Sequence, residues 1–136
     1  MALALRVGEK SFTIGTPSFL KAWFSTIARR LEKGGWGTQF PIIMRSLYGG
    51  AIPYAEAANA LGELERIRVQ LSALPPDQVV WDFEDPSARP PWGNQISSEI
   101  TSLANYFVTS DGKDLLEVLR AALGESLRTK RDVAIM

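Results

Sequence analysis

The chain has 136 residues, of which 46% are hydrophobic and 22% charged, as in an ordinary globular protein, and we expect one domain spanning residues 1–136. Fifteen basic side chains balance fifteen acidic ones, so no overall positive field favours nucleic acid or an anionic membrane as a partner. Cysteine and histidine are both absent, which excludes disulfides, thiol catalysis and every mechanism that uses an imidazole base or ligand. We therefore expect a protein that is not an enzyme and that uses no metal or cofactor.

The amino-terminal residues predict a β-hairpin followed by a helix. Apolar and polar residues alternate over residues 3–7 and again over 11–14, with a short polar turn between them. Thr16 and Pro17 then supply an N-cap and a first-turn proline, and apolar residues at helical spacing predict a helix over about 17–33.

The polar side of this helix carries a basic stripe, in which the residues lie about four positions apart. We expect it to be a solvated face whose aliphatic stems lie along the protein surface. The stripe consists of Lys21, Ser25, Arg29, Arg30 and Lys33.

The middle of the chain predicts two more helical segments. Pro41 starts a short helix that runs through Leu47 and ends at a glycine pair, and we interpret this segment as a connector. Pro53 opens a long amphipathic helix that Pro75 terminates, and its polar side includes Glu63.

Two strands and a last helix complete the predicted fold. Residues 78–83 are rich in β-formers, and residues 103–109 are apolar on both alternating faces, as in an interior strand. A long loop over 84–99 separates them. Ser110 or Asp111 caps the last helix, and the tail adds an edge strand or frays. The order of elements predicts an α+β domain with three main helices on one face of a small mixed or antiparallel sheet.

Charge is unevenly distributed along the chain. Residues 1–50 hold seven basic and two acidic side chains, whereas residues 51–136 hold eight basic and thirteen acidic ones. We therefore expect an electrically two-sided molecule. One compact acidic cluster follows the predicted strand and consists of Asp82, Glu84 and Asp85.

Several interpretations of this acidic cluster stay open. Asp82 and Glu84, two positions apart on a strand, would point the same way, as a carboxylate pair for acid–base catalysis of glycoside hydrolysis requires. A metal site has weaker support, because neither a calcium-loop pattern nor histidine accompanies the carboxylates. The cluster is also compatible with a solvated loop, and with an acidic surface for a basic partner, such as the phosphate-binding face of a protein that cuts nucleic acid.

Three tryptophans outside the first helix have different expected roles. Trp81 lies within the predicted strand and is expected in the core. Trp36 and Trp92 lie among glycine or proline residues, where an indole either closes the domain from a loop or anchors a partner.

Taken together, several short motifs resemble the immunity protein seventy family of bacterial polymorphic toxin systems. The resemblance runs from about Ser25 to Leu123 and is most specific where Pro-Pro-Asp-x-Val-Val-Trp-Asp is followed by Pro-Pro-Trp-Gly. It implies a cytoplasmic antidote that binds and neutralises a toxin domain delivered between neighbouring cells, as in contact-dependent inhibition. No catalytic motif accompanies the family, so the resemblance assigns no catalytic residue.

We therefore expect the cognate toxin C-terminal domain as partner, and neither nucleic acid nor a membrane. The predicted toxin-facing surface combines the acidic cluster with the loop beyond it, and the basic stripe is the next candidate. Two different functions compete with this one: a small carboxylate-dependent enzyme, and an adaptor whose partner is not a toxin. The expected partner-binding residues are Asp82, Glu84, Asp85, Trp92 and Asn94.

Overall fold

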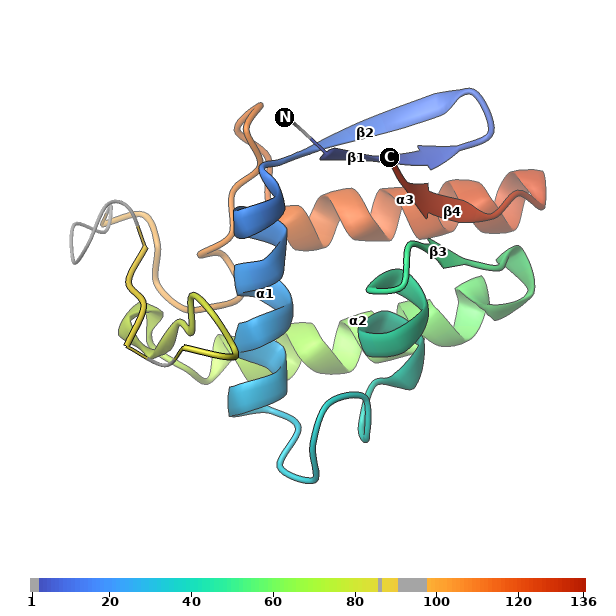
Figure 1. Cartoon of the computed structure of the whole chain (residues 1–136). Helices are drawn as coiled ribbons and strands as arrows, with labels where there is room; N and C mark the ends of the chain where they lie inside the picture. Colours follow the sequence, from blue (N-terminus) through green and yellow to red (C-terminus); the bar gives the residue numbers. More distant parts are fainter. Residues whose placement is uncertain (1–2, 86, 91–97) are drawn as a thin grey trace.

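The computed structural model of the chain describes residues 3–85, 87–90 and 98–136 and shows an α+β domain (Figure 1). Its fold class agrees with the prediction. In chain order the elements are β1 (Leu3–Val7), β2 (Lys10–Gly15), α1 (Pro17–Arg30), the π-helix η1 (Ile42–Leu47), β3 (Ala51–Ile52), the 3-10 helix η2 (Tyr54–Glu56), α2 (Ala57–Ser72), the 3-10 helix η3 (Pro76–Gln78), α3 (Leu115–Thr129) and β4 (Val133–Ile135).

The strands form an antiparallel sheet in the order β2-β1-β4-β3. The predicted β1–β2 hairpin is confirmed, and Gly8 provides the positive φ of 62° in its turn. The tail does not form an edge strand, because Val133 pairs with Val7 on one side and with Ile52 on the other. Sequence reasoning missed β3, whose two residues are too few to show a pattern.

The helices cover one face of the sheet. α3 packs against β1, β2 and β4, α2 packs against α3, and α1 is oriented across them (Figure 1). The opposite face carries exposed Arg6, Ser11 and Thr13. The core between the layers includes Trp23, which is fully buried, and Ile27, also without exposed surface.

The N-cap of α1 is the predicted residue, whereas the N-cap of α3 is a different one. Thr16 caps α1 as predicted, since Phe19 N donates to Thr16 Oγ1 over 3.2 Å. α3 begins later than predicted, because Thr109 and Lys113 close a turn through a backbone bond of 2.7 Å. Asp114 is therefore the cap, and its Oδ1 accepts from Leu116 N over 3.0 Å.

The predicted strand over residues 103–109 is wrong, although the segment is buried. Leu103 N donates to Leu74 O over 3.0 Å, and Phe107 O accepts from Leu115 N over 2.9 Å, so the backbone partners come from scattered segments. The strand-like pairing within residues 103–109 is limited to one β-bridge, between Val108 and Asp114. Apolar side chains on both alternating faces indicate burial, and they indicate a strand only when a neighbouring strand supplies the hydrogen bonds.

Candidate functional site

The segment that carries the acidic cluster lies along the polar side of α1, and we call residues 78–85 the strap. Figure 1 shows the strap in yellow beside the blue helix. Helix side chains take the place of a neighbouring strand: Val80 N donates to Thr26 Oγ1 over 3.0 Å, and Phe83 N donates to Ser25 Oγ over 2.9 Å. The predicted strand over 78–83 is therefore wrong, because the backbone groups of the segment bond to hydroxyls on a helix.

Two arginines of the basic stripe donate hydrogen bonds to the strap, so the stripe is more than the solvated face that we expected. Arg29 donates to Phe83 O over 2.6 Å and stacks on the Phe83 ring, with 4.3 Å from guanidinium to ring centroid. Arg30 Nε donates to Gln78 O over 2.8 Å. Ser25 is fully buried beneath the strap, whereas Lys33 is exposed.

This packing joins the basic and the acidic part of the sequence at one point. Lys21 Nζ lies 3.4 Å from Asp82 Oδ1, so a cation from the basic part of the sequence is paired with an anion from the acidic part. The carboxyl-terminal strand β4 likewise lies beside β1. The two oppositely charged parts of the sequence are interleaved in the fold.

Two members of the acidic cluster make local turns that fix their orientation. Asp82 Oδ1 accepts from Glu84 N over 3.0 Å. Asp85 Oδ1 accepts from the hydroxyl of Ser87 over 2.6 Å and from its backbone N over 3.1 Å, and these bonds lower the pKa of Asp85. Asp85 is thus an ionised surface acceptor at neutral pH, which is opposite to what a general acid requires.

An apolar groove of about 490 Å³ lies beside the acidic cluster, and we call it the aromatic groove. Its rings meet edge to face: the centroids of Trp36 and Tyr48 are 4.8 Å apart, and those of Trp36 and Phe83 are 5.2 Å apart. Tyr48 keeps 51% of its surface exposed. The groove is lined by Lys21, Trp36, Met44, Arg45, Tyr48, Phe83 and Glu84.

Two buried carboxylates hold the loops that form this groove. Glu32 is 3% exposed and accepts from the backbone N of Gly37, Gln39 and Phe40 over 2.9–3.0 Å. Glu63 is 5% exposed and accepts from Ile43 N over 2.9 Å at the start of η1. Glu63 lies on the polar side of α2, and its carboxylate is nevertheless buried against η1.

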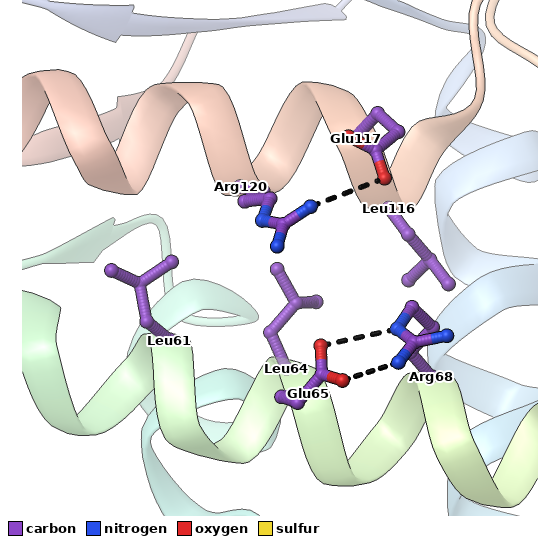
Figure 2. Close-up of a pocket in the computed structure, with 7 residues that line it drawn as sticks. All are labelled: Leu61, Leu64, Glu65, Arg68, Leu116, Glu117 and Arg120. Atoms are coloured by element: carbon purple, nitrogen blue, oxygen red, sulfur yellow. Dashed lines mark hydrogen bonds and ion pairs between the residues drawn. The ribbon is translucent and has the colours of Figure 1, made fainter.

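A second hollow, of about 290 Å³, lies between α2 and α3 (Figure 2). Leu64 and other leucines form its apolar lining, and each helix contributes one ion pair. Arg68 pairs with Glu65, which lowers the pKa of Glu65, and Arg120 Nη1 lies 3.6 Å from Glu117. Each charged side chain here is already paired with one a turn away on its own helix. A binding protein would therefore gain less from contacts in this hollow than in the aromatic groove.

The structure brings together part of the predicted site and adds residues that the sequence did not show. Asp82, Glu84 and Asp85 share one corner of the molecule, whereas Trp92 and Asn94 lie outside the described residues. Trp36 packs as a loop residue that closes the domain, with its indole N–H donating to Met44 O over 2.6 Å. Trp81 is half-buried in the strap and packs against the core.

Sequence reasoning missed Tyr48 and Arg45 as site residues. Both belong to the segment that was interpreted as a connector, and they meet Trp36 and Phe83 only through the tertiary fold. The one signal in the sequence was an aromatic residue next to a glycine pair. That signal does not specify which surface the aromatic residue joins.

Metal-binding clusters and membrane-spanning helices are both absent from the described part of the chain. Within residues 3–85, 87–90 and 98–136, no three Asp or Glu side chains gather in a way that could hold a metal ion. In the same residues, no helix combines the length and the apolar character required to cross a bilayer.

Comparison with known proteins gives one match. The sequence model of the family described as Immunity protein 70 matches residues 5–135, which is wider than the expected range and includes the hairpin and β4. Neither the curated proteins nor the solved structures contain a significant match. The match extends over nearly the whole chain, and this protein therefore belongs to the Immunity protein 70 family.

Proposed function

We propose that this protein binds and neutralises a cognate toxin C-terminal domain by direct contact, in the cytoplasm of the cell that makes it and without catalysis. Membership of an immunity-protein family supports the toxin-neutralising role. Specificity for one toxin and inhibition by binding alone are the parts that we add.

The observation that best supports this function is the fixed position of the acidic cluster. The Val80 and Phe83 amides, on either side of Asp82, donate to hydroxyls of α1 and so hold the strap in place. An inhibitor whose charged surface is already ordered loses less conformational entropy when it binds. A standard interface of about 800 Å² per partner is roughly a tenth of this molecule's accessible surface of 7330 Å².

We place the toxin-facing surface at the acidic cluster, with Trp92 and Asn94 as further proposed contacts. Ionised carboxylates accelerate association with a basic partner and form charge-assisted hydrogen bonds once it is bound. A basic surface of the toxin domain is therefore the expected counterpart. A toxin that binds phosphate groups of nucleic acid would carry such a surface.

Charge reversal tests this proposal. We expect Glu84→Lys with Asp85→Lys to weaken binding by at least about 100-fold, mainly through slower association at low salt, because close charge pairs are lost and steering is reversed. The measurement is surface plasmon resonance against a catalytically silenced form of the toxin domain encoded by the neighbouring gene. A second readout is growth of cells that express the active toxin.

The matched control is Glu9→Lys with Glu117→Lys, which changes the net charge equally at exposed positions away from the strap. We expect this control to bind within about threefold of the wild type, since distant exposed charges are screened. Equal affinity of the wild type and the strap variant would place the interface elsewhere. Failure of the wild-type protein to bind or to restore growth would contradict the proposed function itself.

A further inference from the structure

We propose that the aromatic groove receives an apolar side chain of the toxin domain, flanked on the toxin by one basic and one acidic residue. This inference rests on the proposed function and extends the contact surface beyond the acidic cluster. The groove lies next to that cluster and shares Glu84 with it.

The groove exposes aromatic surface that a protein partner would cover. The Trp36 ring contacts Tyr48 and Phe83 edge to face, and the half-exposed Tyr48 ring also meets Phe24 with centroids 5.2 Å apart. Tryptophan, tyrosine and arginine are the residue types that contribute most to protein interfaces. Trp36, Tyr48 and Arg45 line this groove together.

The groove is formed before any partner arrives. The indole N–H of Trp36 donates to Met44 O over 2.6 Å, and the carboxylates of Glu32 and Glu63 hold the loop and the helix that carry these residues. On the opposite wall, Arg29 holds Phe83 in place: its guanidinium donates to the Phe83 carbonyl and stacks on the Phe83 ring. Few groups need to be ordered on binding, which favours an interface anchor.

The charges at the opening specify the occupant. Lys21 is paired with Asp82. Arg45 and Glu84 line the groove from η1 and from the strap, and neither takes part in an ion pair within the described part of the chain. An apolar side chain between an acidic and a basic residue would complement both walls.

The apolar surface continues past Tyr48 into a smaller hollow of about 250 Å³, which also includes Lys21 and reaches Leu3 and Ile135. The ring of Tyr48 therefore stands between two adjoining hollows. A toxin segment that places a side chain in the aromatic groove would extend along this surface, with Tyr48 as the central contact. Tyr48 is thus the residue whose loss should affect binding most.

The test compares two tyrosines of similar exposure. Tyr48 is 51% exposed in the groove, and Tyr54, which is 46% exposed, lies on η2. By isothermal titration calorimetry against the silenced toxin domain encoded by the neighbouring gene, we expect Tyr48→Ala to weaken binding at least about 30-fold and Tyr54→Ala less than about threefold. Near-ultraviolet circular dichroism and the unfolding midpoint show whether each variant is folded.

Two further variants keep the test independent of folding. Tyr48→Phe retains the ring and should retain binding, and Glu84→Gln with Arg45→Gln removes both charges at exposed positions and should weaken binding about tenfold or more.

Wild-type binding with an unchanged Tyr48→Ala variant would overturn this inference and leave the proposed function intact. Absence of wild-type binding would overturn both. A Tyr48-dependent dimer in sedimentation that the toxin domain does not displace would assign the groove to a second copy and would also overturn the inference.

Discussion

Glu32 shows how a single buried side chain organises the loop in front of the groove. Its two carboxylate oxygens accept from three backbone N–H groups between Gly37 and Phe40, where the chain turns after α1. A buried backbone donor without a partner costs about 1–3 kcal/mol, so a carboxylate that accepts from three of them is an effective way to order this loop. The position of Trp36 depends on the same turn.

We expect Glu32→Gln to lower the free energy of unfolding by about 2–4 kcal/mol, because an amide nitrogen then faces a backbone N–H. Urea unfolding followed by tryptophan fluorescence measures the change. The control is Glu65→Gln, whose ion pair with Arg68 is exposed and should change the free energy of unfolding much less. Equal effects of the two substitutions would contradict a structural role for Glu32.

The sequence could not show which glutamates are buried. Glu63 occupies a polar position in the repeat of α2 and looks solvent-facing, yet its carboxylate is buried against the start of η1. Helical periodicity reports on a hydrophobic face, and it does not report a neighbour that approaches the polar face. The same limit applies to Ser25, which looks like part of a solvated stripe and is fully buried.

At the scale of elements, the strap is an extended segment that owes its order to a helix. Its apolar alternation over residues 79–83 is genuine, since Val79, Trp81 and Phe83 are all partly buried against the core. The alternation was therefore a correct indication of burial, and the predicted strand failed because its backbone partners are the hydroxyls of α1. Each such hydrogen bond contributes about 0.5–1.5 kcal/mol, so a few of them are enough to fix the segment.

Removing these hydroxyls should loosen the strap locally. We expect Ser25→Ala to increase hydrogen exchange at the Phe83 amide, and Thr26→Val to do so at the Val80 amide, by about 10-fold or more each. Exchange measured by nuclear magnetic resonance resolves the two amides, and the amide of Leu5 in β1 serves as the internal reference. Equal acceleration across the whole molecule would indicate global destabilisation in place of local release.

The start of α3 gives a prediction about pH. Burial raises the pKa of Asp114 above its ordinary value of 3.8, although the carboxylate also accepts the bond from Leu116 N. The folded protein therefore holds this proton more tightly than the unfolded chain does. The resulting contribution to stability is fully present below the ordinary pKa and is lost as the pH rises through the raised value.

Asp114→Asn keeps an oxygen for the helix cap and removes the titration. We expect the free energy of unfolding of the wild type, minus that of Asp114→Asn, to fall as the pH rises from about 3 to about 6. Asp114→Ala also loses the cap, so it should be less stable than Asp114→Asn by about 1 kcal/mol at every pH. Thermal unfolding over this pH range measures both differences, and a difference for Asp114→Asn that rises with pH would contradict the assignment.

At the scale of the whole molecule, the class of fold was predictable and the strand order was not. The hairpin, α1 and the amphipathic faces of α2 and α3 follow from local patterns. The position of β4 between β1 and β3 depends on contacts between residues 5 and 135, which no local pattern contains. The aromatic groove was hidden for the same reason, because its walls come from three separate parts of the chain.

The interior position of β4 makes the carboxyl-terminal residues essential for stability. We expect a chain that ends at Arg131 to lose about 3 kcal/mol or more, because burial of Val133 is lost and β3 no longer has a partner strand. Urea unfolding measures the loss, and Ala134→Ser in the full chain, on the opposite face of β4, should change stability by less than about 0.5 kcal/mol. A truncated chain as stable as the full one would show that the sheet does not need β4.

The same strand order constrains how the molecule is made. During synthesis β1 and β2 leave the ribosome before β3 and α3, while β4, the strand that separates β1 from β3, leaves after them. The edge of β1 that pairs with β4 therefore has no partner strand until translation has passed residue 135. On the function proposed above, a chain made only as far as α3 gives no protection, and it becomes an antidote only when β4 inserts.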